Sequence, residues 1–205
     1  MLRYIKLTYY SLIKSYRSKA IKNKTVSIIS NNCWGGFMYQ SCKLQYNSPF
    51  IGLFLFAPDY IKLLKNLEEN LKRKFIYINR EQSKYKNCIE KDYIIGVLEG
   101  TDIEFIFKHY HSIQEIETKW NRRLKRLDFN NMIVKFSDSD LCTPELIKEF
   151  ENLPFKNKVC FTAMPFPQYK TVKFMREHSK RGHVINEWAT SYKYYNFVKE
   201  SNKLL

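Results

Sequence analysis

The amino-acid sequence predicts an α/β fold, a layered α/β/α domain with a largely parallel, mixed sheet. Short β-branched and aromatic runs alternate with helical patterns along most of the chain, which is typical of strands joined by crossover helices. With 205 residues the chain can bury a sizeable core without disulfides. Its five cysteines are an odd number and include no Cys-x-x-Cys pair, which favours reduced thiols.

Seven segments have the length and composition of strands. The first contains the β-branched run 26–29 and stops abruptly at the polar residues 30–32. The expected strands are Thr25–Ser30, Phe50–Phe56, Lys74–Ile78, Ile94–Leu98, Ile103–Lys108, Met132–Phe136 and Lys158–Thr162.

Helix start signals lie between these strands. A Pro-Asp pair opens a helix expected over residues 58–72, with leucines on one stripe. Ser112 begins a Ser-x-x-Glu capping box, and Thr143 precedes a proline at the first position of another helix. Residues 186–205 have an aromatic-rich, helical pattern.

Residues 1–24 are expected to form a basic amphipathic helix ahead of a single α/β domain over residues 25–205. This segment holds seven basic residues and no acidic one. Such a helix is typical of contact with an anionic membrane surface, and the alternative is a helix that packs on the domain or frays. The apolar stripe consists of Leu2, Ile5, Tyr9, Leu12, Ile13, Tyr16 and Ala20.

The net charge of +15 indicates an anionic partner. No nucleic-acid-binding motif is present, so nucleic acid is not expected, and an anionic sugar or phosphate-containing substrate is favoured. No apolar run approaches the roughly 20 residues that span a bilayer. We expect a cytoplasmic protein, with attachment to the inner membrane face as the variant that residues 1–24 favour. The sequence predicts no oligomeric state.

Four unusual clusters follow expected strands: residues 30–36, 109–111, 137–140 and 162–167. Each has an ordinary interpretation as a turn, because Asn, Asp, Gly and Pro are turn residues. In an open parallel sheet, however, ligands bind beyond the carboxyl ends of the strands. We therefore expect a site at this edge that brings together Asn32, Cys33, His109 and Asp138.

Five segments occur in a fixed order between about residues 24 and 170: ISNNCWGG, YNSPFIGLF, DIEFIFKHY, KWNRRLKRL and LPFKNKVCFT. Together they resemble a bacterial family of domains of unknown function often labelled exopolysaccharide biosynthesis protein. The resemblance implies an α/β fold and a role among the products of capsule and lipopolysaccharide gene clusters. It implies no established reaction.

Cys33 and His109 are the candidate catalytic residues. A cysteine followed by two glycines can receive backbone N–H groups, and a histidine at a neighbouring strand end can act as its base. Some capsule-modifying acyltransferases look similar here. Two alternatives remain: Cys33 lines a site without covalent chemistry, or it is purely structural. The residues expected to bind substrate at this corner are Asn31, Asn32, Trp34, Gly35 and Gly36, together with Asp138 at a neighbouring strand end.

A second candidate is the basic segment 119–126, whose Arg122, Arg123 and Arg126 could bind phosphate. The ordinary interpretation is a solvated basic face. Asp138 with Asp140 has the spacing of an Asp-x-Asp metal motif, but this signal is too weak to predict a metal.

The sequence thus favours a group transferase in surface-polysaccharide biosynthesis that transfers an acyl group to a sugar. The alternatives are a glycosyltransferase-like or sugar-phosphate-handling enzyme and a non-catalytic pathway scaffold. Candidate donors are a coenzyme A thioester and a nucleotide sugar.

Overall fold

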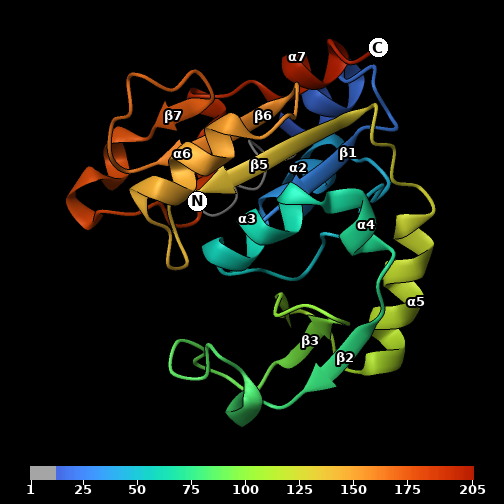
Figure 1. Ribbon diagram of the computed structural model, residues 1–205. Helices are drawn as coiled ribbons and strands as arrows, with labels where there is room; N and C mark the ends of the chain where they lie inside the picture. Colours follow the sequence, from blue (N-terminus) through green and yellow to red (C-terminus); the bar gives the residue numbers. More distant parts are fainter. Residues whose placement is uncertain (1–12) are drawn as a thin grey trace, which may run out of the picture.

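The computed structural model describes residues 13–205 and contains two sheets (Figure 1). The larger sheet is wholly parallel and has the strand order β1-β5-β6-β7. The smaller is antiparallel, in the order β2-β3-β4. The prediction of an α/β fold with a largely parallel sheet is confirmed. The strands are β1 (Ser27–Ser30), β2 (Phe75–Ile78), β3 (Ile94–Leu98), β4 (Glu104–Phe107), β5 (Met132–Ser137), β6 (Lys158–Thr162) and β7 (Val172–Phe174).

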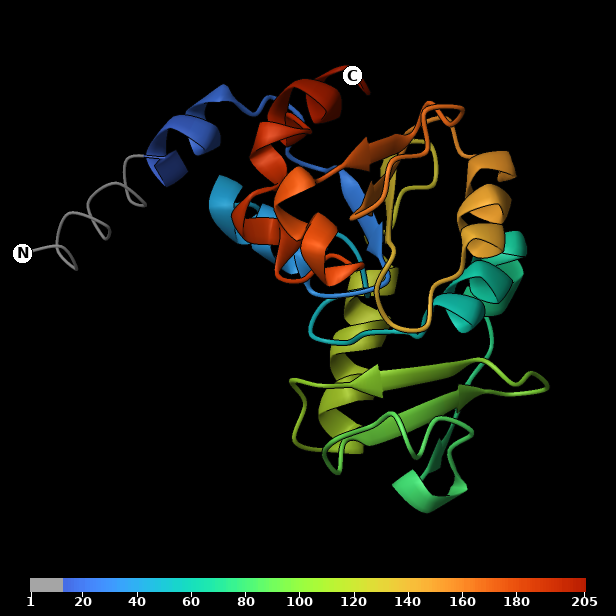
Figure 2. The same cartoon turned by 90° about the vertical axis from the view of Figure 1, so that its left-hand side faces the viewer.

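Helices cover both faces of the parallel sheet (Figure 2). Alternate residues of a strand point to opposite faces. Ile28 of β1 accordingly packs in the same core as α2 (Trp34–Cys42). Its neighbour Ile29 lies in the other core, with α3 (Ala57–Lys65) and α6 (Pro144–Asn152).

The antiparallel sheet packs on α5 (Ile113–Leu124). Trp120 of this helix lies 4.8 Å from Phe75 and 5.5 Å from Phe105 between ring centroids. A Cβ at Gly96 would lie 2.8 Å from a ring carbon of Phe75 and 2.9 Å from one of Phe107, so this packing requires glycine. Trp120, Phe105 and Phe107 belong to one buried core cluster with Phe136 of the parallel sheet, and Phe75 packs against it. This cluster therefore joins the two sheets.

Several predicted elements differ from the structure. Residues 50–56 form a buried loop in which only Phe54 pairs with a strand, because Gly52 has a φ of +77° that interrupts an extended backbone. The helix expected over residues 58–72 breaks at Asn66, and α4 (Leu67–Leu71) follows the break. The three strands β2–β4 form their own sheet instead of joining the parallel one.

The C-terminal segment is less helical than expected. It consists mainly of short 3₁₀ turns, followed by one turn and a half of α-helix. Within residues 186–205 these elements are η3 (Glu187–Ala189), η4 (Ser191–Lys193) and α7 (Phe197–Asn202). Two further 3₁₀ helices lie elsewhere, η1 (Arg80–Gln82) and η2 (Arg176–Arg181).

Residues 13–20 form a helix that leads into the domain. The backbone N–H of Lys22 donates to Oδ1 of Asn202 (2.8 Å), and Ile21 is buried in the core. Tyr16 of the expected apolar stripe is 74% exposed. Residues 1–12 of the expected amphipathic helix lie outside the described residues. Within residues 13–205, no helix combines the length and apolarity needed to cross a membrane.

Candidate functional site

The segment Ser30–Gly36 connects β1 to α2, and it opens a helix as well as forming a turn. Cys33 is the N-cap residue of α2, and its side chain makes no capping hydrogen bond. Gly35 lies where a Cβ would come within 3.0 Å of Cγ2 of Ile28, so the glycine lets the helix approach the strand closely. The segment therefore places a partly exposed thiol at a helix N-terminus beyond the carboxyl end of β1.

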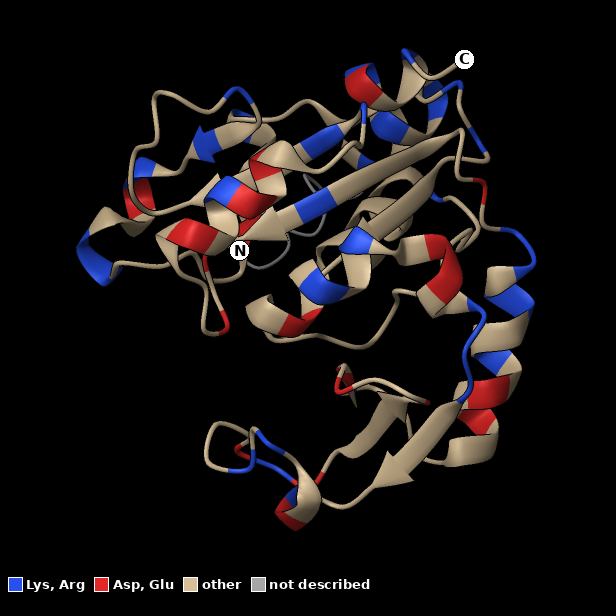
Figure 3. Cartoon of the chain, in the orientation of Figure 1, with Lys and Arg blue, Asp and Glu red and all other residues tan. Residues whose placement is uncertain are grey.

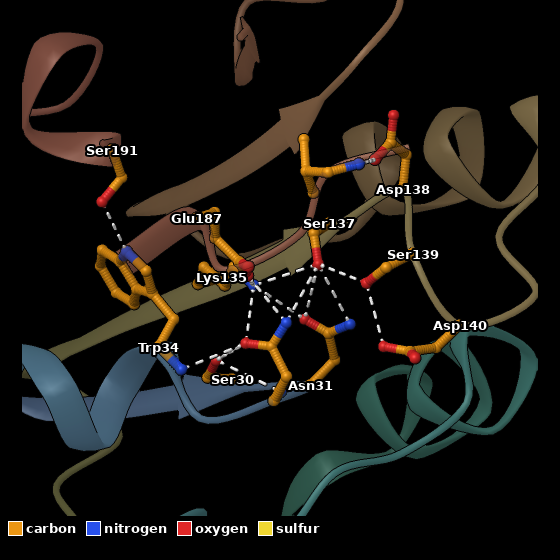
Figure 4. Close-up of polar contacts among 12 residues, drawn as sticks. Ser30, Asn31, Trp34, Lys135, Ser137, Asp138, Ser139, Asp140, Glu187 and Ser191 are labelled. Atoms are coloured by element: carbon orange, nitrogen blue, oxygen red, sulfur yellow. Dashed lines mark hydrogen bonds and ion pairs between the residues drawn. The ribbon is translucent and has the colours of Figure 1, made fainter. Parts of the chain in front are cut away.

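A buried ion pair, Lys135 with Glu187, is drawn in Figure 4. Glu187 lines a cavity together with Cys33. Lys135 of β5 is fully buried, and its Nζ pairs with Oε1 of Glu187, which is 2% exposed. The ammonium also donates to Oδ1 of Asn31 (3.2 Å), Oδ1 of Asn32 (2.9 Å) and Oγ of Ser137 (3.1 Å). These contacts offset the large desolvation cost of burying two charges.

Asn32 connects the ion pair to the Cys33 segment. Its Nδ2 donates to Glu187 Oε1 (2.7 Å), while its Oδ1 accepts from the backbone N–H of Trp34 (3.2 Å). Burial alone would oppose ionisation of Glu187, but the charge of Lys135 and these hydrogen bonds hold the pKa of the carboxyl below its ordinary value. The carboxyl of Glu187 is therefore ionised near neutral pH, and Asn32 links it to the backbone that carries Cys33.

Cys33 and His109 line the same cavity, of about 370 Å³. We call it the basic cavity, because its charged residues are cationic. His109 follows β4 of the antiparallel sheet, and its backbone N–H donates to the carbonyl of Gly52 (2.9 Å). The buried loop 50–56 thus brings His109 to Cys33, although the sequence argument placed both at the edge of one sheet. The lining residues are Cys33, Gly36, Phe37, Gln40, Tyr46, Ile51, Gly52, His109, Tyr110, Lys119 and Arg123.

Arg123 supplies the buried positive charge of this cavity. The residue is 6% exposed, its Nη1 donates to Oη of Tyr110 (2.7 Å), and its guanidinium lies 5.1 Å from the centroid of the Tyr46 ring. Its Nε is buried and has no hydrogen-bond partner among residues 13–205. Lys119, one helical turn earlier, pairs with Glu115. The wall therefore retains an excess of positive charge, which suits an anionic ligand.

Cys33 also lines a second cavity, of about 360 Å³. We call it the aromatic cavity, because the side chains of Phe54, Phe56, Tyr93 and Trp188 line it. Asn32, Asp140 and Glu187 contribute amide and carboxylate groups to it. The full lining is Asn32, Cys33, Phe54, Phe56, Cys88, Ile89, Glu90, Tyr93, Lys108, Ser139, Asp140, Val184, Ile185, Asn186, Glu187 and Trp188.

The ionisation states of Cys33 and His109 follow from their surroundings. Burial raises the pKa of the Cys33 thiol, an effect that the charge of Lys108 partly opposes. Burial, together with Lys108, lowers the pKa of His109. Near neutral pH the structure thus holds a protonated thiol and a neutral imidazole, the combination in which the imidazole can accept the thiol proton. Among the described residues, no hydrogen bond joins the two side chains directly.

The basic segment of α5 divides between the cavity and the surface. Figure 3 shows its C-terminal half carrying Lys and Arg and its N-terminal half carrying Glu. Arg123 reaches the basic cavity, whereas Arg122 is exposed and lines none of the cavities described in this chain. Arg126 donates from Nη2 to the carbonyl of Tyr46 (2.6 Å), so it supports the cavity wall from behind.

Three other expected site residues are placed in the interior. Trp34 is fully buried and donates from Nε1 to Oγ of Ser191 (2.9 Å), and Asn31 is fully buried at the ion pair. Gly35 contacts β1, whereas Gly36 lines the basic cavity. Neither Trp34, Asn31 nor Gly35 reaches a cavity described in this chain.

Asp138 and Asp140 have different partners. Asp138 accepts from the backbone N–H groups of Ala163 (2.5 Å) and Val184 (2.7 Å), so it ties two loops together. Asp140 accepts from Oγ of Ser139 (2.9 Å) and lines the aromatic cavity. Across residues 13–205, no group of three or more His, Cys, Asp or Glu side chains is arranged to hold a metal ion.

Sequence reasoning missed the ion pair. Lys135 could have been noticed, because a lysine within the apolar run MIVKF of a central strand must find a partner when the strand is buried on both faces. Lys135 lies within β5, which pairs with β1 on one side and with β6 on the other. Glu187 carries no comparable signal, because it lies in an irregular segment whose position no periodicity predicts.

Comparison with known proteins gives two matches. The model of a family described as a domain of unknown function (DUF1919) matches residues 5–204. An uncharacterized protein of Haemophilus influenzae is 33% identical over 166 residues, which cover 81% of this chain and 75% of that protein. The family match spans the β1–α2 corner, the basic cavity and the ion pair. The chain therefore belongs to the DUF1919 family of domains of unknown function.

Proposed function

We propose that this protein is a group transferase of surface-polysaccharide biosynthesis that moves an acyl group from a thioester donor to a sugar hydroxyl through Cys33. The observation that carries the proposal is that one partly exposed thiol lines two cavities of different character. A covalent group transfer needs a nucleophile that both donor and acceptor can reach. The pathway assignment rests on the resemblance of the segments around Cys33, His109 and α5 to proteins labelled for exopolysaccharide biosynthesis.

The basic cavity suits the donor. Coenzyme A carries phosphates, and Arg123 offers a buried guanidinium whose Nε lacks a partner. The aromatic cavity suits the sugar, because Tyr93 and Trp188 contribute aromatic rings while the carboxylate of Asp140 offers acceptors for hydroxyl groups.

The reaction would proceed in two balanced steps. In the first, His109 takes the thiol proton, Cys33 Sγ attacks the thioester carbonyl carbon, and the donor's C–S bond breaks. The departing thiolate takes the proton from His109. In the second, His109 removes the proton of a sugar hydroxyl, the oxygen attacks the acyl carbon, and Cys33 Sγ leaves and regains the proton. The hydrogen bond between thiol and base would form as the donor orders the cavity, since such bonds are often loose in empty sites.

Acylation of Cys33 tests this proposal directly. The protein is incubated with acetyl coenzyme A and its intact mass is measured. We expect one acetyl group on the unaltered protein and on Cys142→Ser, which removes a partly exposed thiol that lines neither cavity, and none on Cys33→Ser. Equal acylation of Cys33→Ser, or no acylation of the unaltered protein, would contradict the proposal.

The acylation rate should also depend on His109. A base works only when neutral, so the rate should fall as the pH drops through the pKa of His109, which lies below the ordinary value of about 6.5. His109→Gln should lower the rate by about 10²–10⁴ and remove this acid limb. A pH–rate profile with the same acid limb in His109→Gln would exclude the histidine as the base.

One observation favours a second candidate, a sugar-phosphate-handling enzyme without covalent chemistry. The unpartnered Nε of Arg123 and the excess positive charge of the basic cavity would suit the phosphates of a nucleotide sugar equally well. In that case Cys33→Ser would retain activity while Arg123→Met would lose it. A non-catalytic scaffold would have no enzymatic activity that either substitution could change.

A further inference from the structure

An apolar groove lies on the outer side of α2, between the helix of residues 13–20 and the segment that includes η3 and η4. Its volume is about 550 Å³. The polar and charged residues of its lining are Lys14, Arg17, Gln40 and Ser41, and the lining contains no carboxylate. Its apolar wall consists of Ile13, Phe37, Met38, Trp188, Ala189 and Tyr192.

Large aromatic side chains are exposed along this groove. Phe37 is 38% exposed and Tyr192 is 55% exposed. Phe37 stacks on Trp188, with the ring centroids 4.5 Å apart and the ring planes 8° from parallel. Exposed apolar surface of this kind is unfavourable in water and marks sites where an apolar partner binds.

The groove adjoins both cavities that share Cys33. Phe37 and Gln40 line the groove and the basic cavity, and Trp188 lines the groove and the aromatic cavity. The stacked pair of Phe37 and Trp188 therefore stands between the groove and the thiol. A ligand could place a chain in the groove and its head group in either cavity without leaving the surface.

The charges around the groove indicate the nature of that head group. Lys14 and Arg17 lie on the groove itself, and Arg123 lies in the adjoining basic cavity. An apolar channel flanked by cations and free of carboxylates complements an apolar chain that carries an anionic group.

We infer that the groove binds the apolar chain of a lipid phosphate, and that the sugar acceptor is carried on this lipid. The identity of the acceptor rests on the proposed function, whereas binding of the lipid chain rests on the groove alone. The stacked rings of Phe37 and Trp188 would cover the chain where it passes from the groove toward Cys33. The anionic head group would lie against Arg17 or Arg123, whose forked donors match a phosphate.

Binding of farnesyl phosphate below its micelle concentration tests the inference by titration calorimetry, with farnesol and inorganic phosphate as comparison ligands. We expect farnesyl phosphate to bind at least tenfold more tightly than either. Tyr192→Glu, which places a carboxylate on the groove, should weaken binding at least tenfold. Ile76→Glu is the matched control, because Ile76 is 52% exposed on β2 of the other sheet, and it should leave binding unchanged.

Phe37→Ser provides a second groove variant should Tyr192→Glu fail to fold, and circular dichroism checks both. Equal affinity for farnesyl phosphate and inorganic phosphate would overturn the inference, as would unchanged binding by a folded groove variant. Binding to phosphatidylglycerol vesicles without binding of monomeric farnesyl phosphate would also overturn it, in favour of a membrane-surface contact. Cys33→Ser separates the two proposals, because it should abolish acylation yet bind farnesyl phosphate normally.

Discussion

Residues 13–205 contain two clusters of buried ion pairs and hydrogen-bonded carboxylates, one at each sheet, and the two differ in what lies beside them. At the parallel sheet, Lys135 and Glu187 are buried, and Asn32, which hydrogen-bonds to both, lines the aromatic cavity together with Cys33. At the antiparallel sheet, Asp59 of α3 is fully buried and accepts from the backbone N–H of Glu104 (2.8 Å), from Tyr85 Oη (3.0 Å) and from Lys84 Nζ (2.7 Å).

The second cluster joins elements of the fold. Asp59 lies on a helix that covers the parallel sheet, and Glu104 begins β4, so their contact holds the two sheets together. Glu104 in turn accepts from Oγ of Ser83 (2.5 Å) and from the backbone N–H of Lys84 (3.0 Å). None of these residues lines a cavity described in this chain. Burial of charge therefore does not by itself identify a site, and contact with a cavity distinguishes the two clusters.

The largest expected effect is on the ion pair. Glu187→Leu should reduce the free energy of unfolding by about 3–5 kcal/mol, because Lys135 would remain buried without its partner. The double variant Lys135→Met, Glu187→Leu should recover about 2 kcal/mol or more, since no lone charge remains. Urea denaturation measures both. Glu149→Leu is the control: its pair with Lys65 is exposed, so removal should cost about 0–1 kcal/mol. If the double variant is no more stable than Glu187→Leu, the unpaired charge of Lys135 is not the cause of the lost stability.

The pH dependence of stability in acid should depend on the same ion pair of Lys135 and Glu187. Because the folded-state pKa of Glu187 is lowered, its ionisation stabilises the fold above the unfolded-state pKa of about 4.3. This contribution is lost as the pH falls through the lower, folded-state pKa. The double variant should therefore lose less stability than the unaltered protein between about pH 5 and the acid limit of folding. Parallel pH profiles would argue against an ionised Glu187.

A somewhat smaller loss is expected at the other cluster. Asp59→Ala leaves the N–H of Glu104 and the hydroxyl of Tyr85 without an acceptor, which should cost about 2–4 kcal/mol. Lys84 is one-third exposed, so its charge can turn to water. Acylation of Cys33 by the folded fraction should be unchanged, whereas Glu187→Leu should slow it. Slower acylation by folded Asp59→Ala would remove the distinction between the two clusters.

The sequence predicted well those features that depend on local pattern. The caps at Ser112 and Thr143 each accept a hydrogen bond from the backbone N–H three residues later, as their spacing predicts. The parallel strands were found because apolar runs mark strands buried on both faces. The unexpected strand β7 has only three residues and lacks such a run.

Features that depend on long-range packing could not be read from the sequence. The antiparallel pairing of β2–β4 is set by packing on Trp120, and Phe50–Phe56 has a strand-like composition although Gly52 turns its backbone. His109 and Cys33 line one cavity because that loop joins them, a contact between segments that no spacing in the sequence encodes. Their proposed catalytic roles remain predictions.

The smallest expected effect concerns the two glycines that follow Trp34, which the sequence analysis grouped together. A Cβ at Gly35 would meet Cγ2 of Ile28 at 3.0 Å, and Ile28 is fully buried and cannot move away. A Cβ at Gly36 would meet only Cγ2 of Ile51, at 3.8 Å, an ordinary contact. Both residues lie in the first turn of α2, where alanine is intrinsically favoured over glycine by about 0.5–1 kcal/mol.

Gly36→Ala should therefore be neutral or stabilise the fold by up to about 1 kcal/mol, whereas Gly35→Ala should destabilise it by about 1 kcal/mol because the methyl group overpacks the core. Gly96→Ala in the antiparallel sheet should cost more than Gly35→Ala, since the Phe75 and Phe107 rings leave even less room. Melting temperatures of the three variants give the order. Equal destabilisation at Gly35 and Gly36 would mean that backbone freedom, and not the close contact of α2 with β1, explains why this corner carries two glycines.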